Sequence, residues 1–126
     1  MEPKELEAVV NAWILAQETY GEIGLDEDNP WPIEKVSDWH LEGNHELLWQ
    51  FILTTYKRNL SASVQAMLAA GPLEDFLVNF GEMYIEQVET LSTKDPSFRH
   101  LLRGVWKNAM TDEVWSRIQA LRTEIW

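Results

Sequence analysis

The amino-acid sequence predicts an all-α fold, which we expect to be a single compact, irregular bundle of about seven short helices in antiparallel pairs. Apolar residues recur with the helical period in one segment after another, and no stretch alternates apolar and polar residues over the length of a strand. Glycine, proline and N-capping residues separate these segments at short intervals. The same rhythm also suits a short HEAT-like solenoid fragment, but no internal repeat of about 30–45 residues is visible, so the bundle is favoured.

Length and composition fit one helical domain over residues 1–126. A chain of 126 residues can bury about two-thirds of its unfolded surface. It has no cysteine, which excludes disulfides and thiolate zinc sites and suits a reducing cytoplasm. The first ten residues, MEPKELEAVV, are partly acidic and amphipathic, unlike a signal peptide, and no apolar run approaches the roughly 20 residues of a membrane span. We therefore expect a cytoplasmic protein that does not contact the membrane.

In the first half of the chain, capping residues predict where the helices lie. The expected helices cover 2–20, 34–42 and 45–59, and Ser61 caps a further one that leads into Gly71. Gly43 ends the second helix, and Asn44 caps the third. Because the third helix carries apolar residues on two faces, we expect it to be the central one.

The second half contains the clearest stop and start signals. Gly71 is expected to end one helix and Pro72 to start the next, which Gly81 closes. The later boundaries are predicted at Lys94, Asp95-Pro96, Asn108 and Thr111. The centres of the apolar stripes predict a nearly fully buried core of Phe51, Ile52, Phe76, Leu77, Leu101, Leu102 and Ile118.

Three segments of this half resemble a bacterial family of small domains of unknown function. They are AAGPLEDFL, DPSFRHLLRGVWKNAM and DEVWSRIQ, which match the family pattern AAGPLEDLL, DPxFRxLLxGVW and M-x-DEVWxRxQ. Upstream, only the helical phase and a tryptophan-rich helix are similar, and Trp39, Trp49 and Trp126 depart from the pattern. The resemblance implies an all-helical domain and brings no activity with it.

The strongly acidic balance limits the partners that we expect. The formal net charge is −11, so the surface repels phosphate backbones and anionic lipid and favours encounter with a basic protein. We therefore expect no direct nucleic-acid binding. The competing interpretation is that the charge serves solubility alone.

One loop-like segment, GEIGLDEDNPWPI, is the expected partner-binding element. It carries the acids Asp26, Glu27 and Asp28 beside Trp31, which we interpret as a buried anchor for a basic partner. The alternative is that Trp31 folds back as a plug over the protein's own core. Of the seven tryptophans, Trp31 and Trp126 are the two whose phase assigns them to no core stripe.

A second group of candidate residues lies in the segments that carry the resemblance. Glu74 or Asp75 is expected to form an ion pair with Arg99 or Arg103 and so join two helices. Contact with a partner is the alternative role. A third interpretation is a ligand pocket between helices, where these acids would meet His100 and Arg103.

No catalytic, metal or cofactor motif is present. His40 and His45 lie five residues apart, whereas histidines that share a zinc site on one helix are four apart, and no cysteine completes a site. The sequence has no G-x-S-x-G turn, phosphate-binding loop or H-E-x-x-H helix. We expect no cofactor and no metal.

These observations favour a non-enzymatic, acidic protein-binding module, such as an immunity or inhibitor protein that neutralises a basic, nucleic-acid-handling partner. A structural or regulatory subunit that forms a homodimer is the second hypothesis. A small-ligand protein or enzyme with a pocket between its helices is the third. Whether the protein is a monomer or a homodimer stays open at this point.

Overall fold

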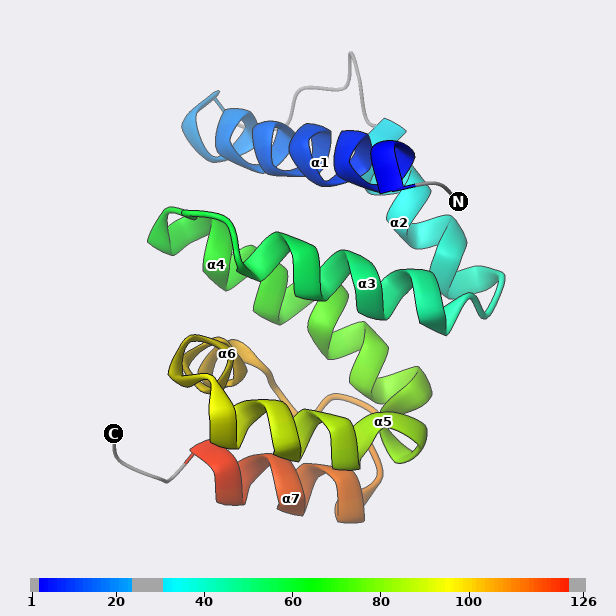
Figure 1. Ribbon diagram of the computed structural model, residues 1–126, viewed down its shortest axis with the longest axis vertical. Helices are drawn as coiled ribbons and strands as arrows, with labels where there is room; N and C mark the ends of the chain where they lie inside the picture. Colours follow the sequence, from blue (N-terminus) through cyan, green and yellow to red (C-terminus); the bar gives the residue numbers. More distant parts are fainter. Residues whose placement is uncertain (1–2, 24–30, 123–126) are drawn as a thin grey trace. The chain divides into compact units, whose positions relative to one another are not determined.

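The computed structural model describes residues 3–23 and 31–122, which form helices and the short segments that connect them, with no strand among them (Figure 1). The α-helices are α1 (Pro3–Ile23), α2 (Trp31–Leu41), α3 (His45–Tyr56), α4 (Ala62–Leu68), α5 (Glu74–Lys94), α6 (Pro96–Leu101) and α7 (Asp112–Arg122). A π-helical turn, η1 (Ala69–Leu73), joins α4 to α5, and a short 3-10 helix, η2 (Leu102–Gly104), follows α6. The predicted all-α class is confirmed.

The helices form two compact units, unit 1 (Met1–Met67) and unit 2 (Leu68–Trp126). Each unit has internal contacts of its own. The single domain expected over 1–126 stays a prediction. In the parts of the chain that the structure describes, no helix has the length and apolar character needed to cross a membrane.

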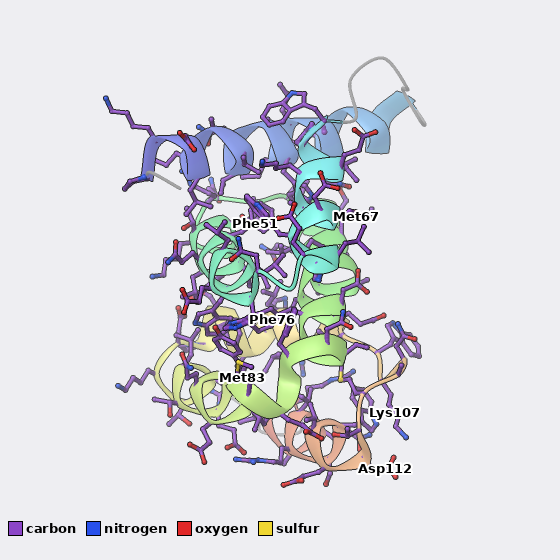
Figure 2. All side chains as sticks on the ribbon, turned by 90° about the vertical axis from the view of Figure 1, so that its right-hand side faces the viewer. Phe51, Met67, Phe76, Met83, Lys107 and Asp112 are labelled. Carbon is purple, nitrogen blue, oxygen red and sulfur yellow. The ribbon has the colours of Figure 1, made fainter. Side chains whose placement is uncertain are left out.

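In unit 1, the helices α1, α2 and α3 pack on one another around Phe51 (Figure 2). Phe51 lies on α3 and is fully buried. The rings of Trp13 on α1 and Trp39 on α2 approach it edge-on, with centroid distances of 5.6 Å and 6.1 Å. Two of the tryptophans are therefore core residues of this unit, as their helical spacing predicts.

The predicted caps in unit 1 are confirmed. Gly43 takes a φ of +72°, a backbone conformation that glycine reaches without strain. The Asn44 side chain accepts a hydrogen bond from the Leu47 N–H at 3.5 Å, and Ser61 Oγ accepts one from the Val64 N–H at 3.3 Å. These side chains satisfy backbone donors that a helix leaves open in its first turn.

In unit 2, α5 is the long helix, and α6 and α7 pack on it. Figure 1 shows α5 and α7 side by side. Phe76 on α5 is fully buried, and its ring centroid lies 4.8 Å from that of Tyr84. Asp95 caps α6 by accepting from the Ser97 N–H, and Thr111 caps α7 by accepting from the Val114 N–H, both as predicted.

The helix break predicted at Gly71-Pro72 is wrong. The chain stays helical through both residues, because η1 widens into a π-helical turn in which the Glu74 N–H reaches back to the Ala69 carbonyl. A proline inside an α-helix has no N–H to donate, and its ring clashes with the carbonyl four residues earlier. The wider turn relieves that clash without ending the helix.

The stop predicted at Gly81 is also wrong, for a different reason. Gly81 lies inside α5, where α7 comes so close that a Cβ atom at this position would lie 2.9 Å from Val114 Cγ1. Its role is therefore close packing of two helices. Helix α2 likewise starts at Trp31, three residues earlier than predicted, and α3 ends at Tyr56, three residues earlier.

The predicted core is confirmed in full. The side chains of its seven members are at most 4% exposed; they are Phe51, Ile52, Phe76, Leu77, Leu101, Leu102 and Ile118. The helix end predicted at Asn108 is wrong, because regular helix already ends at Gly104; Asn108 takes a φ of +47° in the loop that follows.

Candidate functional site

One side of helix α2 is exposed and combines acidic with apolar side chains; we call it the α2 face. It consists of Trp31, Glu34, Asp38 and Leu41. Their spacing of three, four and three residues brings them to the same side of a helix that turns every 3.6 residues. Trp31 is 43% exposed and Leu41 is 86% exposed. The two acids thus lie between two exposed apolar side chains.

The opposite side of α2 fixes this face in place. Pro32, Val36 and Trp39 are buried there, and Trp39 contacts Phe51. Because the buried residues set the rotation of the helix, the α2 face points away from the core of unit 1. Trp31 lies on this outward side, while its neighbour Pro32 is the residue that packs inward.

Of the predicted partner-binding set, Asp26, Glu27 and Asp28 lie outside the described residues. Trp31 is described and exposed, as an anchor for a partner would be. Its role in binding stays a prediction. Glu34 and Asp38 were missed in the sequence, although their spacing from Trp31 is visible there once α2 is known to begin at Trp31.

The negative charge is unevenly divided between the two units. Residues 1–67 contain twelve acidic and four basic residues, a net charge of −8, whereas residues 68–126 contain nine acidic and six basic residues, a net charge of −3. The acids of unit 1 that the structure describes are all exposed. Glu7 forms a long ion pair of 3.9 Å with Arg58. Unit 1 therefore carries most of the net negative charge that would attract a basic partner.

In unit 2, the Glu74 carboxylate holds a loop. Its Oε1 accepts a hydrogen bond from the backbone N–H of Trp106 at 2.9 Å, and its Oε2 accepts one from the Asn108 side-chain amide at 3.3 Å. Glu74 therefore joins the start of α5 to the loop that precedes α7. The pairing of Glu74 or Asp75 with Arg99 or Arg103 stays a prediction.

The same loop is held from its other side by Arg122 of α7. Its guanidinium donates to the carbonyl oxygens of Val105, at 2.9 Å, and Arg103, at 3.1 Å, and lies 5.2 Å from the centroid of the Trp115 ring. Beneath the loop, a Cβ atom at Gly104 would lie 2.7 Å from the Cβ of Ala69. We call residues 103–108 the Trp106 loop.

Trp106 itself is 73% exposed, the most exposed tryptophan that the structure describes. The sequence places it beside Val105 in the GVW segment, where core spacing suggested a buried ring. Helix geometry ends at Gly104, so the helical phase does not extend to Trp106, and Val105 alone turns inward. Gly104, directly before Val105 and Trp106, was the sequence signal that the helix ends there.

An ion pair joins the C-terminal part of the Trp106 loop to the start of α7. Lys107 Nζ lies 2.5 Å from Asp112 Oδ1, at the first residue of α7 (Figure 2). The hydrogen bond from Lys107 lowers the pKa of the Asp112 carboxyl group. Both side chains are largely exposed, so this contact orients the loop more than it stabilises the fold.

A second ion pair joins α5 to α7. The Arg117 guanidinium binds both carboxylate oxygens of Glu89, with Nε at 2.9 Å from Oε2. This hydrogen bonding lowers the pKa of Glu89 and raises that of Arg117. Two parallel N–H···O bonds fix the relative position of the two helices better than a single contact.

The predicted alternative of a ligand pocket between helices stays a prediction. A hollow of about 400 Å³ lies along α5 and the start of α7, lined by residues 77–83, Thr111 and Val114. None of Glu74, Asp75, His100 or Arg103 lines it. In the described residues no three side chains of the histidine, cysteine, aspartate and glutamate types are grouped as a metal ion would require.

Comparison with known proteins gives one match. A family model described as a family of unknown function (DUF6869) matches residues 20–125. No curated protein and no solved structure matches the chain.

Proposed function

Since the chain belongs to this family of unknown function over most of its length, we propose from its own geometry that it is a non-enzymatic, acidic protein-binding module. Its partner is a basic protein, bound through the α2 face. The observation that carries the proposal is the exposed Trp31, which lies on the same side of α2 as Glu34 and Asp38. The predicted acids Asp26, Glu27 and Asp28 precede this face in the sequence.

The physical roles of the two kinds of side chain differ. Exposed carboxylates act mainly on the rate of association, because they steer a basic surface toward the face. Large aromatic side chains contribute most of the binding free energy where a partner covers them completely. Trp31 therefore acts as the anchor, and Glu34 and Asp38 set the approach and the orientation.

This chemistry suits an immunity or inhibitor protein that neutralises a nucleic-acid-handling partner. Such partners carry basic surfaces for phosphate backbones, and an acidic face competes for them. The proposal places the protein in the cytoplasm, consistent with a chain that has no cysteine. It requires neither a metal nor a cofactor.

The test is capture of the partner from the native host with two matched variants of the full chain. Glu34→Gln with Asp38→Asn removes two charges from the α2 face, whereas Glu5→Gln with Glu46→Gln removes two exposed charges elsewhere in unit 1. We expect the wild type and the control pair to retain the same basic protein and the α2 pair to lose most of it. Retention of one basic protein by all variants places binding elsewhere, and capture of no basic protein contradicts the proposal.

A further inference from the structure

The hollow along α5 and the start of α7, which we call the α5 hollow, lies within unit 2. Its volume of about 400 Å³ falls in the range of pockets that hold small molecules. The residues that line it are 77–83, Thr111 and Val114, and all of them belong to this unit. The hollow is therefore complete within one compact part of the chain, and no residue of another unit is needed to form it.

The inner lining of the α5 hollow is apolar. Leu77 and Val114 are buried, and Gly81, which is buried as well, has no side chain to fill the space. Further out, Phe80 is half-buried and Met83 is 61% exposed, so both present apolar surface to a ligand. Methionine side chains adapt to apolar groups of different shapes. A ligand of this hollow therefore has an aliphatic or aromatic body.

Three polar side chains line the α5 hollow, and Glu82 is the only charged one among them. Asn79 donates its side-chain amide to the Asp75 carbonyl at 2.9 Å, and Thr111 Oγ accepts from the Val114 N–H at 3.2 Å. In the part of the chain that the structure describes, no hydrogen bond or ion pair engages the Glu82 carboxylate. The polar group with the most left to offer a ligand is therefore a carboxylate.

The charges around the α5 hollow favour a positively charged ligand. The basic side chains of α7 and of the loop before it already bind other groups of the protein; they are Lys107, Arg117 and Arg122. Glu86, one turn beyond Glu82 on α5, is a second exposed acid. Because these three cations are engaged elsewhere, the charge that a ligand meets at the hollow is negative.

We propose that the α5 hollow binds a small organic ammonium ion with an apolar body. The body packs against Phe80 and Met83, and the ammonium group lies beside the Glu82 carboxylate. An ammonium group donates up to three hydrogen bonds and carries a charge, so a carboxylate binds it more strongly than it binds a hydroxyl group. The face of the Phe80 ring also attracts a cation. Asn79 and Thr111 can bind charged and neutral ligands alike, so Glu82 determines the selectivity.

This inference goes beyond the proposed function and does not depend on it. The α2 face belongs to unit 1 and the α5 hollow to unit 2, so the two sites share no residue. Ligand binding is measured on the purified chain alone, whereas the proposed function requires a basic protein from the host. The two proposals therefore fail in different experiments.

The experiment is an NMR titration of the full chain with three probes that share one aromatic ring. They are 2-phenylethylammonium, the neutral 2-phenylethanol and the anionic 3-phenylpropionate. We expect the ammonium probe to bind with a dissociation constant of about 1 mM or lower. It should bind about fivefold more tightly than the alcohol, and the anion should not bind measurably. The amide shifts should concentrate on residues 77–83 and Thr111.

Two charge-matched variants of α5 test the role of the carboxylate. Glu82→Gln removes the charge that lines the hollow, whereas Glu86→Gln removes an exposed charge one turn further on, outside the lining. Glu82→Gln should weaken the ammonium probe about fivefold and leave the alcohol unchanged, and Glu86→Gln should bind both probes as the wild type does. Absence of ammonium binding, equal affinity for the ammonium and the alcohol, shifts centred outside the hollow, or an equal effect of the two variants would each overturn the proposal.

Discussion

Glu74 and Trp106 are joined across 32 residues of sequence by a hydrogen bond of 2.9 Å from the Trp106 backbone N–H to the Glu74 carboxylate. This single acceptor connects the first turn of α5 to the loop before α7. The hydrogen bond also explains why an acid is useful at this position. Because η1 runs directly into α5, no free helix N-terminus lies there for the acid to stabilise.

Removing this carboxylate should loosen the Trp106 loop. We expect Glu74→Ala to lower the free energy of unfolding by about 1–2 kcal/mol, because two hydrogen bonds to a charged acceptor are lost. Amide exchange at Trp106 should speed up with it. Glu82→Ala removes an exposed acid of the same helix and serves as the control. Unchanged exchange at Trp106 in Glu74→Ala would show that Arg122 alone holds the loop.

The core of unit 2 depends on Phe76. Its ring is fully buried and contacts Tyr84 and Phe80. Truncation in Phe76→Ala leaves a cavity and should lower the free energy of unfolding, measured with urea, by about 3–5 kcal/mol. A loss below about 1 kcal/mol would mean that the unit refills this space, contrary to the tight packing described.

Gly81 tests the close approach of α5 to α7. Alanine favours helix by up to about 1 kcal/mol over glycine, but overpacking costs about 1–3 kcal/mol, so Gly81→Ala should destabilise the fold. The clash is with Val114, whose Cγ1 lies 2.9 Å from the added carbon. In a Val114→Ala background, Gly81→Ala should become neutral or stabilising. Equal effects in both backgrounds would contradict the packing account.

The Glu89–Arg117 pair should make stability depend on pH on the acid side. The arginine lowers the pKa of Glu89 in the folded protein, so the pair stabilises the fold above the ordinary pKa of about 4.3. This stabilisation is lost as the pH falls through the lowered pKa. The drop in unfolding free energy from about pH 7 to about pH 3 should be smaller in Glu89→Gln than in the wild type. Glu82→Gln is the control, and an equal drop in Glu89→Gln would assign the acid sensitivity to other carboxyl groups.

Periodicity and capping residues predicted the helical class and the buried core because both depend on short-range patterns. Asn44, Ser61, Asp95 and Thr111 act as caps through backbone groups two or three residues away, which a sequence shows directly. Gly81 was misinterpreted because its reason lies across space, in Val114.

The residues of the candidate sites were harder to predict from the sequence, because their structural roles also depend on contacts far away along the chain. Glu74 finds hydrogen-bond partners 32 and 34 residues away, a separation that no local sequence pattern shows. Trp106 had core spacing, and only the end of regular helix at Gly104 exposes it. Trp31 was identified because its segment breaks the helical pattern visibly.

Binding kinetics on the captured basic protein, over a series of salt concentrations, test the central claim most directly. The α2 variant Glu34→Gln with Asp38→Asn should associate more slowly than the wild type and with a flatter salt dependence, because steering charges are gone. Trp31→Ala should mainly speed dissociation, by about thirtyfold for an anchor worth about 2 kcal/mol, whereas Leu15→Ala, an exposed apolar residue of α1, should change neither rate. Wild-type rates in both the α2 variant and Trp31→Ala would contradict the account, because the partner would then be bound by another surface.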